Sequence, residues 1–191
     1  MQSMGVRPNH VTWNGLIAGF TQCGKPEKAL DVFHQMQQEG SEPNHVTYIS
    51  TLKACYDITA LNSAKLIHTQ ITEKCCGGSL DIITWNTVIK MYATCGSLKD
   101  ACEVFNELSE RNVETWNSMI SGYSGHGMNE LVLMSFEGML QEGVRPDIIT
   151  FTCLLSACCH LGLVHEACKH LTSMQEVYGI TPNQDHINCM T

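Results

Sequence analysis

The segment CCHLGLVHEACKH, residues 158–170, gathers the side chains that proteins most often use to bind metals. Two histidines share one face of a helix when they are four residues apart, as in zinc proteases. The histidines of HEACKH are five residues apart, and the chain contains no Cys-x-x-Cys pair. We therefore expect no metal site. The segment is interpreted as packed thiols, Cys158 and Cys168, and mostly exposed imidazoles, His160, His165 and His170.

Other catalytic patterns are also missing from the sequence. It has no glycine-rich phosphate loop, no nucleophile elbow, and no His-x-Glu with a downstream Cys-x-x-Cys of the kind that zinc deaminases use. We expect this chain not to be an enzyme, and to need no cofactor and no small-molecule substrate.

Asparagines recur in a context that suggests binding. Asn14, Asn86 and Asn117 each follow a tryptophan, in the stretches VTWNGLIAGF, ITWNTVIKMY and ETWNSMISGY. An asparagine amide both donates and accepts hydrogen bonds. The alternative is local capping of a helix start, which asparagine also favours. Each of these asparagines is expected about one turn inside a helix, beyond the capping position, and this placement favours ligand binding.

These stretches belong to a longer repeat. The aromatic position recurs at intervals of 31 to 37 residues: Trp13, Tyr48, Trp85, Trp116, Phe151 and, as an aliphatic residue, Ile187. Within each unit the apolar residues are spaced by three and four, which predicts helices. Gly24, Gly96, Gly127 and Gly162 suit left-handed caps that end a first helix. Each unit therefore contains two helices, and stacked units form an all-α solenoid.

Composition limits the possible partners. The chain has 191 residues, 43% of them hydrophobic, and no apolar run approaches the roughly 18 residues that span a membrane. We expect no membrane contact. Eleven cysteines lie in apolar-periodic segments, which is typical of reduced thiols. The net charge of −8 weakens any general attraction to a polyanion, so a nucleic-acid partner must be argued from a local surface.

The segment VTWNGLIAGFTQCGKPEKALDVFHQMQQEGSEPN resembles the pentatricopeptide repeat (PPR). The tetratricopeptide repeat has a similar period, but its Trp, Leu-Gly and Tyr spacing is absent. The resemblance implies a right-handed α-solenoid of stacked helix-turn-helix repeats. Unit lengths further resemble the P, L and S repeats of the PLS subfamily. We expect a fragment with a preceding tail (1–9), P type (10–44), L type (45–81), S type (82–112), P2-like (113–147), L2-like (148–183) and the start of an S2-like repeat (184–191).

The resemblance also implies which residues read RNA bases. In the family, the residue after the aromatic acts with the last residue of the same repeat. The base-reading residues are then Asn14 with Asn44, Ile49 with Asp81, Asn86 with Asn112, Asn117 with Asp147, and Thr152 with Asn183, followed by Asn188. The first and third pairs should prefer a pyrimidine, the fourth U, and the fifth A.

Aliphatic residues near each repeat start should sandwich the bases, namely Val11, Val46, Ile83 and Ile149. Glu114 and Asp185 depart from this pattern, and an acidic side chain there should weaken base packing. The family often places lysine near the end of the first helix to meet phosphate, where this chain has Gln22, Asp57, Thr94, Gly125 and His160.

Two functions follow from these features. The first, which the resemblance implies, is sequence-specific binding of single-stranded organellar RNA, one base per repeat, as the recognition part of a mitochondrial or chloroplast C-to-U editing factor. Its deaminase would lie beyond residue 191 or act in trans, and other editing-complex proteins would be partners. The alternative is a protein-protein interaction scaffold that uses the concave face of the solenoid.

Overall fold

The computed structural model describes residues 8–74 and 81–188, and every regular element in these ranges is a helix. The helices are α1 (His10–Gln22), α2 (Pro26–Gln38), α3 (His45–Asp57), α4 (Leu61–Lys74), α5 (Ile82–Thr94), α6 (Leu98–Glu107), α7 (Val113–Gly125), α8 (Asn129–Gln141), α9 (Ile148–His160), α10 (Val164–Glu176) and α11 (Gln184–Asn188). The chain divides into two compact units, Met1–Cys95 and Gly96–Thr191. Within the described ranges no helix is long and apolar enough to cross a membrane.

Each first helix begins at a capped turn. The side chains of Asn9, Asn44, Asp81, Asn112 and Asp147 precede α1, α3, α5, α7 and α9, and each accepts the backbone N–H of a threonine three residues later. Such a cap stabilises a helix by about 1 kcal/mol. Three of these threonines also return a side-chain bond to the cap backbone, completing a capping box. The last residue of an expected repeat is therefore the N-cap of the next one.

First helices end in left-handed residues, as the sequence predicted. Gly24, Gly96, Gly127 and Gly162 have φ between +66° and +79°, a region that favours glycine because it has no Cβ. Thr59 takes the same place in the second repeat at φ +50°. The Lys25 N–H then donates to the Phe20 carbonyl at 2.9 Å, which closes the turn between α1 and α2. Short turns of this kind make the two helices of a repeat neighbours.

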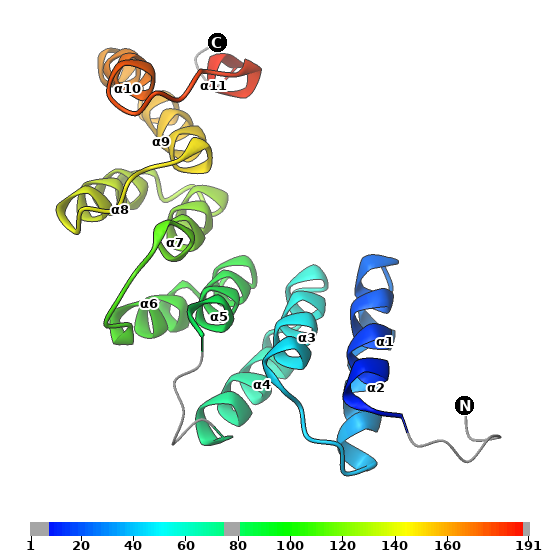
Figure 1. Cartoon of the computed structure of the whole chain (residues 1–191). Coiled ribbons are helices and arrows are strands. Elements are labelled where there is room, and N and C mark those ends of the chain that lie inside the picture. The colour runs from blue at the N-terminus through cyan, green and yellow to red at the C-terminus, as the bar shows by residue number, and fades with distance from the viewer. Residues whose placement is uncertain (1–7, 75–80, 189–191) are drawn as a thin grey trace. The chain divides into compact units, whose positions relative to one another are not determined.

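In the first unit, α1 packs on α2 and α3, and α3 packs on α4 and α5 (Figure 1). Large apolar side chains fill the space between the helices, and Phe33, Met36, Leu52, Ile71 and Ile89 are fully buried. Ala29 and Ala64 are also fully buried on the second helices. Small side chains thus lie in the packed interior at these two positions.

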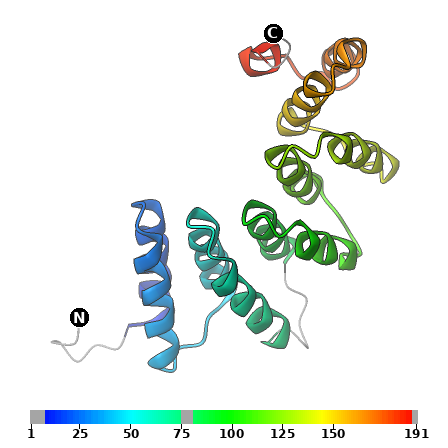
Figure 2. The same ribbon diagram turned by 180° about the vertical axis from the view of Figure 1, so that it is seen from behind.

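The second unit follows the same plan, with α7 against α8 and α9, and α9 against α10 and α11 (Figure 2). One cluster contains Trp116, Ile120, Val132 and Met139, and the next contains Phe136, Phe151, Leu154 and Met174. Trp13 and Trp116 are buried, and the ring of Trp85 lies edge-on to His68 with centroids 6.0 Å apart. Trp13 and Trp116 are thus core residues, whereas Trp85 is half-buried.

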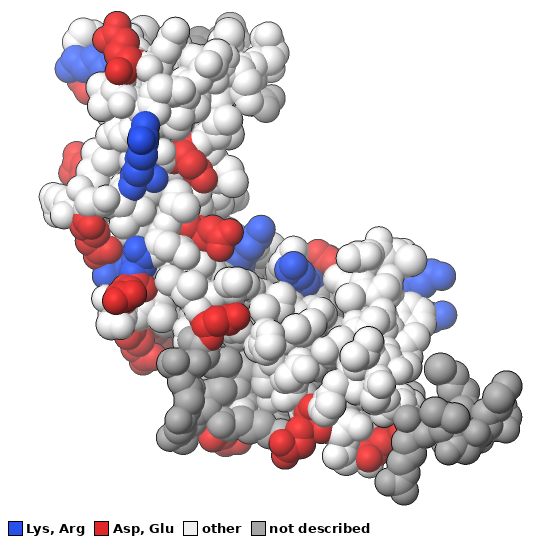
Figure 3. All heavy atoms as spheres, in the orientation of Figure 1, with Lys and Arg blue, Asp and Glu red and all other residues white. Residues whose placement is uncertain are grey.

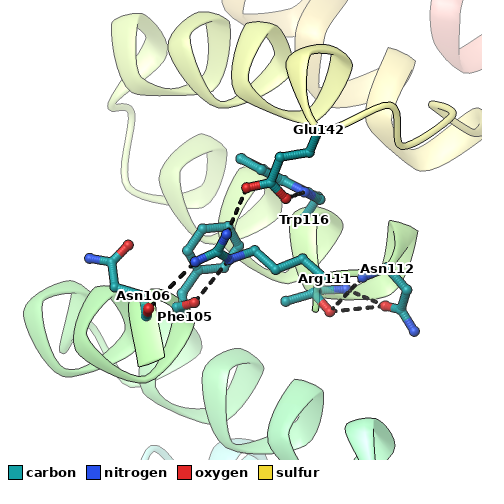
Figure 4. A network of polar contacts seen from close by, with 7 residues as sticks. Phe105, Asn106, Arg111, Asn112, Trp116 and Glu142 are labelled. Atoms are coloured by element: carbon teal, nitrogen blue, oxygen red, sulfur yellow. Dashed lines mark hydrogen bonds and ion pairs between the residues drawn. The ribbon is translucent and has the colours of Figure 1, made fainter. Parts of the chain in front are cut away.

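A polar network joins the ends of α6 and α8 to α7 (Figure 4). The Arg111 guanidinium lies over the Phe105 ring, its Nε donates to the Phe105 carbonyl at 3.0 Å, and its Nη1 pairs with Glu142 at 2.6 Å. The second oxygen of Glu142 accepts the Trp116 indole N–H at 3.2 Å. This network satisfies the indole N–H of a buried tryptophan.

Candidate functional site

Asn14 lies in the second turn of α1, and its side chain is held by two residues, Thr47 of α3 and the N-cap residue Asn44. Its Nδ2 donates to Asn44 Oδ1 at 3.2 Å, and its Oδ1 accepts the Thr47 hydroxyl at 2.6 Å. The cap oxygen of Asn44 is itself oriented by the Thr47 backbone N–H at 3.0 Å. The amide orientation of Asn14 is consequently set by two partners.

The same arrangement occurs at Asn117 in α7. Its Nδ2 donates to Asp147 Oδ1 at 2.9 Å, and its Oδ1 accepts the Thr150 hydroxyl at 2.7 Å. Asn117 is 7% exposed and Thr150 is fully buried. Two pairs that the resemblance predicted, Asn14 with Asn44 and Asn117 with Asp147, are therefore in direct contact.

These bonds leave polar atoms for a ligand. Asn14 and Asn117 each keep a second Nδ2 hydrogen that forms no bond to the described residues. Asp147 Oδ2 and the Asn44 amide nitrogen likewise form no hydrogen bond to the described residues, because the cap bonds use the other oxygen of Asp147 and the oxygen of Asn44. The first repeat thus offers amide donors, whereas the fourth offers an amide donor beside a carboxylate acceptor.

The fifth pair is bridged by a histidine. Thr152 and Asn183 form no bond to each other among the described residues, but both contact His186, which is fully buried. Its Nδ1 accepts the Asn183 N–H at 3.0 Å, and its Nε2 lies 3.1 Å from the Thr152 hydroxyl. The Nε2–H tautomer fits both contacts, because Thr152 donates its own hydrogen to the Ile148 carbonyl.

The remaining predicted readers are placed as follows. Ile49 is half-buried on α3 and has no polar atom, while Asp81 is exposed and caps α5. The Thr84 hydroxyl bonds to Asp81 and holds the pKa of that carboxyl below its usual value. Asn86 is buried on α5, and Asn112 caps α7. Asn188 is exposed and accepts a bond from Gln184 at 2.9 Å.

Because Asn14, Asn86 and Asn117 lie inside helices whose caps are other residues, the capping alternative does not apply to them.

The four aliphatic residues expected to sandwich bases are exposed. Their exposed fractions are 78%, 42%, 52% and 51% for Val11, Val46, Ile83 and Ile149. Exposed aliphatic side chains beside polar readers suit contact with the faces of bases. Glu114 is exposed at the same place in the fourth repeat, and the side chain of Asp185 is outside the described residues.

Basic residues that sequence reasoning missed lie on the first helices. Lys53 and Lys90 are exposed, four residues after Ile49 and Asn86, and so one turn along the same face of α3 and α5. The Lys90 ammonium also lies 5.7 Å from the centre of the Tyr56 ring. The sequence feature that could have identified these lysines is their spacing of four residues from the predicted reading position. On the face shown in Figure 3, the described Lys and Arg side chains are scattered among Asp and Glu.

The five positions where the family often has lysine are all exposed here, namely Gln22, Asp57, Thr94, Gly125 and His160. They supply no lysine or arginine, and the exposed lysines of α3 and α5 are Lys53 and Lys90.

The cysteine and histidine segment was interpreted correctly in part. Cys158 is buried, but Cys168 is exposed, so its interpretation as a packed thiol is wrong. His160 and His165 are exposed, whereas His170 is half-buried with its ring 5.4 Å from that of Phe136. Burial lowers the pKa of His170. The described residues contain no group of three side chains able to hold a metal ion.

Comparison with known proteins identifies the repeat. A model of the PPR repeat family matches residues 1–57, 80–115 and 111–160, and a model of the PPR repeat matches residues 149–177. Pentatricopeptide repeat-containing protein At4g30700 of Arabidopsis thaliana is 39% identical over 179 residues, which cover 94% of this chain and 22% of the relative. Two further Arabidopsis relatives, one named mitochondrial and one chloroplastic, are each 37% identical over 94% and 96% of the chain. This chain covers 28% and 22% of those two relatives, and so spans about a quarter of their length.

Solved structures share the fold. The maize pentatricopeptide repeat protein PPR10 superposes with a TM-score of 0.73 at 21% identity, over 97% of this chain and 27% of that one. PPR10 in complex with an 18-nt psaJ RNA element superposes with a TM-score of 0.75 at 23% identity, over 98% of this chain and 27% of that one. The α-solenoid of helix-turn-helix repeats that the sequence predicted is thereby confirmed.

Proposed function

This chain belongs to the pentatricopeptide repeat family, and on that basis we propose that it binds single-stranded RNA and reads one base with each repeat. The observation that carries the proposal is the paired asparagine site, present at Asn14 with Asn44 and at Asn117 with Asp147. In both, a reading amide is oriented by the last residue of its repeat and keeps one hydrogen for a ligand. Other helical-repeat proteins also read each RNA base with only two or three side chains.

The chemistry of the last residue assigns a base to each pair. In the fourth repeat, the Asn117 amide hydrogen can donate to a carbonyl oxygen of U while Asp147 Oδ2 accepts the N3–H of U. The Watson–Crick edge of C has an acceptor at N3, which the carboxylate would repel. In the first repeat, Asn44 replaces the carboxylate by an amide, which does not repel N3 of C, and the amide donors can reach a carbonyl oxygen of either pyrimidine. By the resemblance, Asn86 with Asn112 also reads a pyrimidine, and Thr152 with Asn183 reads A.

Exposed aliphatic side chains supply contact that does not depend on sequence. Val11, Val46, Ile83 and Ile149 would pack against the faces of bases, and such packing tolerates every base. Electrostatic attraction is weak, given the net charge of −8. Affinity therefore rests on the sum of contacts over successive repeats rather than on phosphate neutralisation.

We further propose that the chain is the recognition part of an organellar C-to-U editing factor of the PLS subfamily. The unit lengths support this assignment, and the names of relatives support a mitochondrial or chloroplast location. The proposal assigns no reaction to these residues; a deaminase would lie beyond residue 191 or be one of the partner proteins of an editing complex.

A protein-interaction scaffold is the second candidate. The acidic net charge, the exposed Glu114 and the exposed aliphatic residues Val11 and Ile83 would suit a peptide as well as an RNA. The two candidates differ in base preference, which only an RNA reader has.

The test is selection of short RNAs from a randomised single-stranded pool by the 191-residue chain and by Asn117→Thr. We expect one position of the selected motif to prefer U and to move toward G in the variant, with about 1–3 kcal/mol of discrimination. The position read by Asn14 and Asn44 serves as the internal control and should keep its pyrimidine. A folded chain that selects no motif would remove the RNA proposal and leave the scaffold.

A further inference from the structure

Three reading residues, Asn14, Asn117 and Thr152, each contact a third side chain, which belongs to the repeat that follows. The Thr47 hydroxyl donates to Asn14 Oδ1 at 2.6 Å, and the Thr150 hydroxyl donates to Asn117 Oδ1 at 2.7 Å. Both threonines are the third residue of the next first helix and both are fully buried. We propose that this third residue positions the reading residue of the preceding repeat and thereby sharpens its choice of base. The proposal rests on the proposed function and extends it to a residue outside each reading pair.

An asparagine amide needs such a partner because its two ends are nearly the same size. A rotation of 180° exchanges a donor for an acceptor and would present the wrong pattern to a base. In the fourth repeat, the Thr150 oxygen accepts the Asp147 backbone N–H at 3.1 Å. Its own hydrogen lies within reach of Asn117 Oδ1 at 2.7 Å and of the cap oxygen Asp147 Oδ1 at 3.0 Å, and the contact with Asn117 is the shorter. The hydroxyl therefore fixes the oxygen of the amide, while Asp147 fixes the nitrogen.

Helix capping alone does not explain these contacts. Thr84 is the third residue of α5 and bonds to its cap Asp81 at 2.7 Å through its hydroxyl and 3.0 Å through its backbone. The preceding reading position is Ile49, which has no polar atom to receive a hydroxyl. Thr84 thus stabilises its helix cap but positions no reading residue. A substitution at Thr84 therefore measures the effect of losing a cap hydroxyl alone.

The fifth repeat shows the same contact, but there the reading side chain is short and the third side chain of the next helix is long. There the reading residue is the short Thr152, and the third residue of α11 is the long His186, with Nε2 3.1 Å from the Thr152 hydroxyl. In the first and fourth repeats a long asparagine meets a short threonine. The combined reach of the two side chains is kept, as expected if they act on each other.

The test compares Thr150→Val, Thr150→Ser and Thr84→Val in the same randomised RNA selection. Thr150→Val keeps the shape and removes the hydroxyl. We expect the preference for U at the Asn117 position to fall roughly tenfold, the effect of losing one buried hydrogen-bond partner. Thr150→Ser should restore the preference, and Thr84→Val, which loses an equivalent cap hydroxyl, should leave it unchanged. An undiminished preference in Thr150→Val, or an equal loss in Thr84→Val, would overturn the proposal.

A measurement without RNA separates this proposal from the proposed function. In the free chain, the side-chain amide hydrogen that Asn117 donates to Asp147 should exchange slowly with solvent by NMR, and faster in Thr150→Val but not in Thr150→Ser or Thr84→Val. That pattern supports positioning even if no RNA motif is selected. Exchange that is equally slow in Thr150→Val would show that the threonine does not hold the amide.

Discussion

Asn14 and Asn117 form their side-chain bonds with residues 30 and 33 positions later in the chain. Both amides are consequently oriented before any ligand arrives. Orientation in advance reduces the conformational freedom that binding would otherwise remove, and this favours discrimination between similar ligands. The polar groups left for a ligand are few, and each has a defined direction.

Cysteine reactivity offers a test of burial at the same scale. Burial raises the pKa of the Cys55 thiol to about 12, and it also raises the pKa of Cys158. The thiolate is the nucleophile, so both should alkylate slowly, whereas the exposed Cys23 and Cys168 should alkylate quickly. Timed iodoacetamide labelling with peptide mass spectrometry measures this, and urea should remove the difference. Equal rates for Cys55 and Cys23 in the folded chain would contradict the structure.

The sequence was sufficient to predict some of the site and not the rest. Recurrence after an aromatic residue identified Asn14 and Asn117, and the resemblance supplied their partners. The role of Thr47 and Thr150 was missed, because a threonine at the third position of a helix already has an explanation as part of a cap. Only the distance across two repeats reveals its second contact.

At the scale of helices, one glycine marks a close contact between α8 and α7. Gly138 lies in α8, and a Cβ placed there would be 2.9 Å from Cη2 of Trp116. The tryptophan is buried in the cluster formed with Ile120 and Val132, so its ring has little room to move. This contact makes Gly138 a packing residue rather than a flexible one.

We expect Gly138→Val to lower the free energy of unfolding by about 1–3 kcal/mol through overpacking. Gly19→Ala is the matched control, because it is also a helical glycine but a Cβ there meets nothing within 4 Å. That change should raise the free energy of unfolding by about 0.5–1 kcal/mol. Urea unfolding followed by circular dichroism gives both values. A neutral Gly138→Val would mean that α7 and α8 are less closely packed than described.

Helix ends were more predictable than helix contacts. Gly24 and Gly96 indicated left-handed positions in the sequence, because no other residue type adopts the left-handed conformation so readily. Thr59, with φ +50°, shows the limit, since its residue type gives no warning of a left-handed conformation. The role of Gly138 was equally hidden, because it depends on the position of Trp116 in another helix.

At the scale of the whole molecule, charge decides how binding responds to salt. The chain has 11 basic and 19 acidic residues, and Lys53 and Lys90 are the lysines that the first helices present one turn beyond a reading position. Attraction to an RNA backbone should therefore involve few phosphates.

For single-stranded RNA, each neutralised phosphate contributes about −0.7 to the slope of log affinity against log salt concentration. We expect a shallow slope of about −1 to −2 for this chain, reduced in magnitude by about 0.7 in Lys53→Gln and again in Lys90→Gln. Lys99→Gln is the control, since Lys99 is exposed on α6 and pairs with Glu103. Titrations at several salt concentrations measure the slopes. A steep slope that neither Lys53→Gln nor Lys90→Gln changes would assign the backbone contacts to other residues.

The bond from Thr150 to Asn117 crosses the boundary between two repeats, and this matters for anyone who transplants repeats as cassettes. A cassette cut at residues 113–147 carries Asn117 and Asp147 into its new host but leaves Thr150 behind, so the graft inherits whichever third residue the host provides. A cut made one helical turn later would move the three side chains together. Sequence-programmable arrays built from such cassettes should therefore be joined within the first helix, after its third residue, rather than at the loop where one repeat ends.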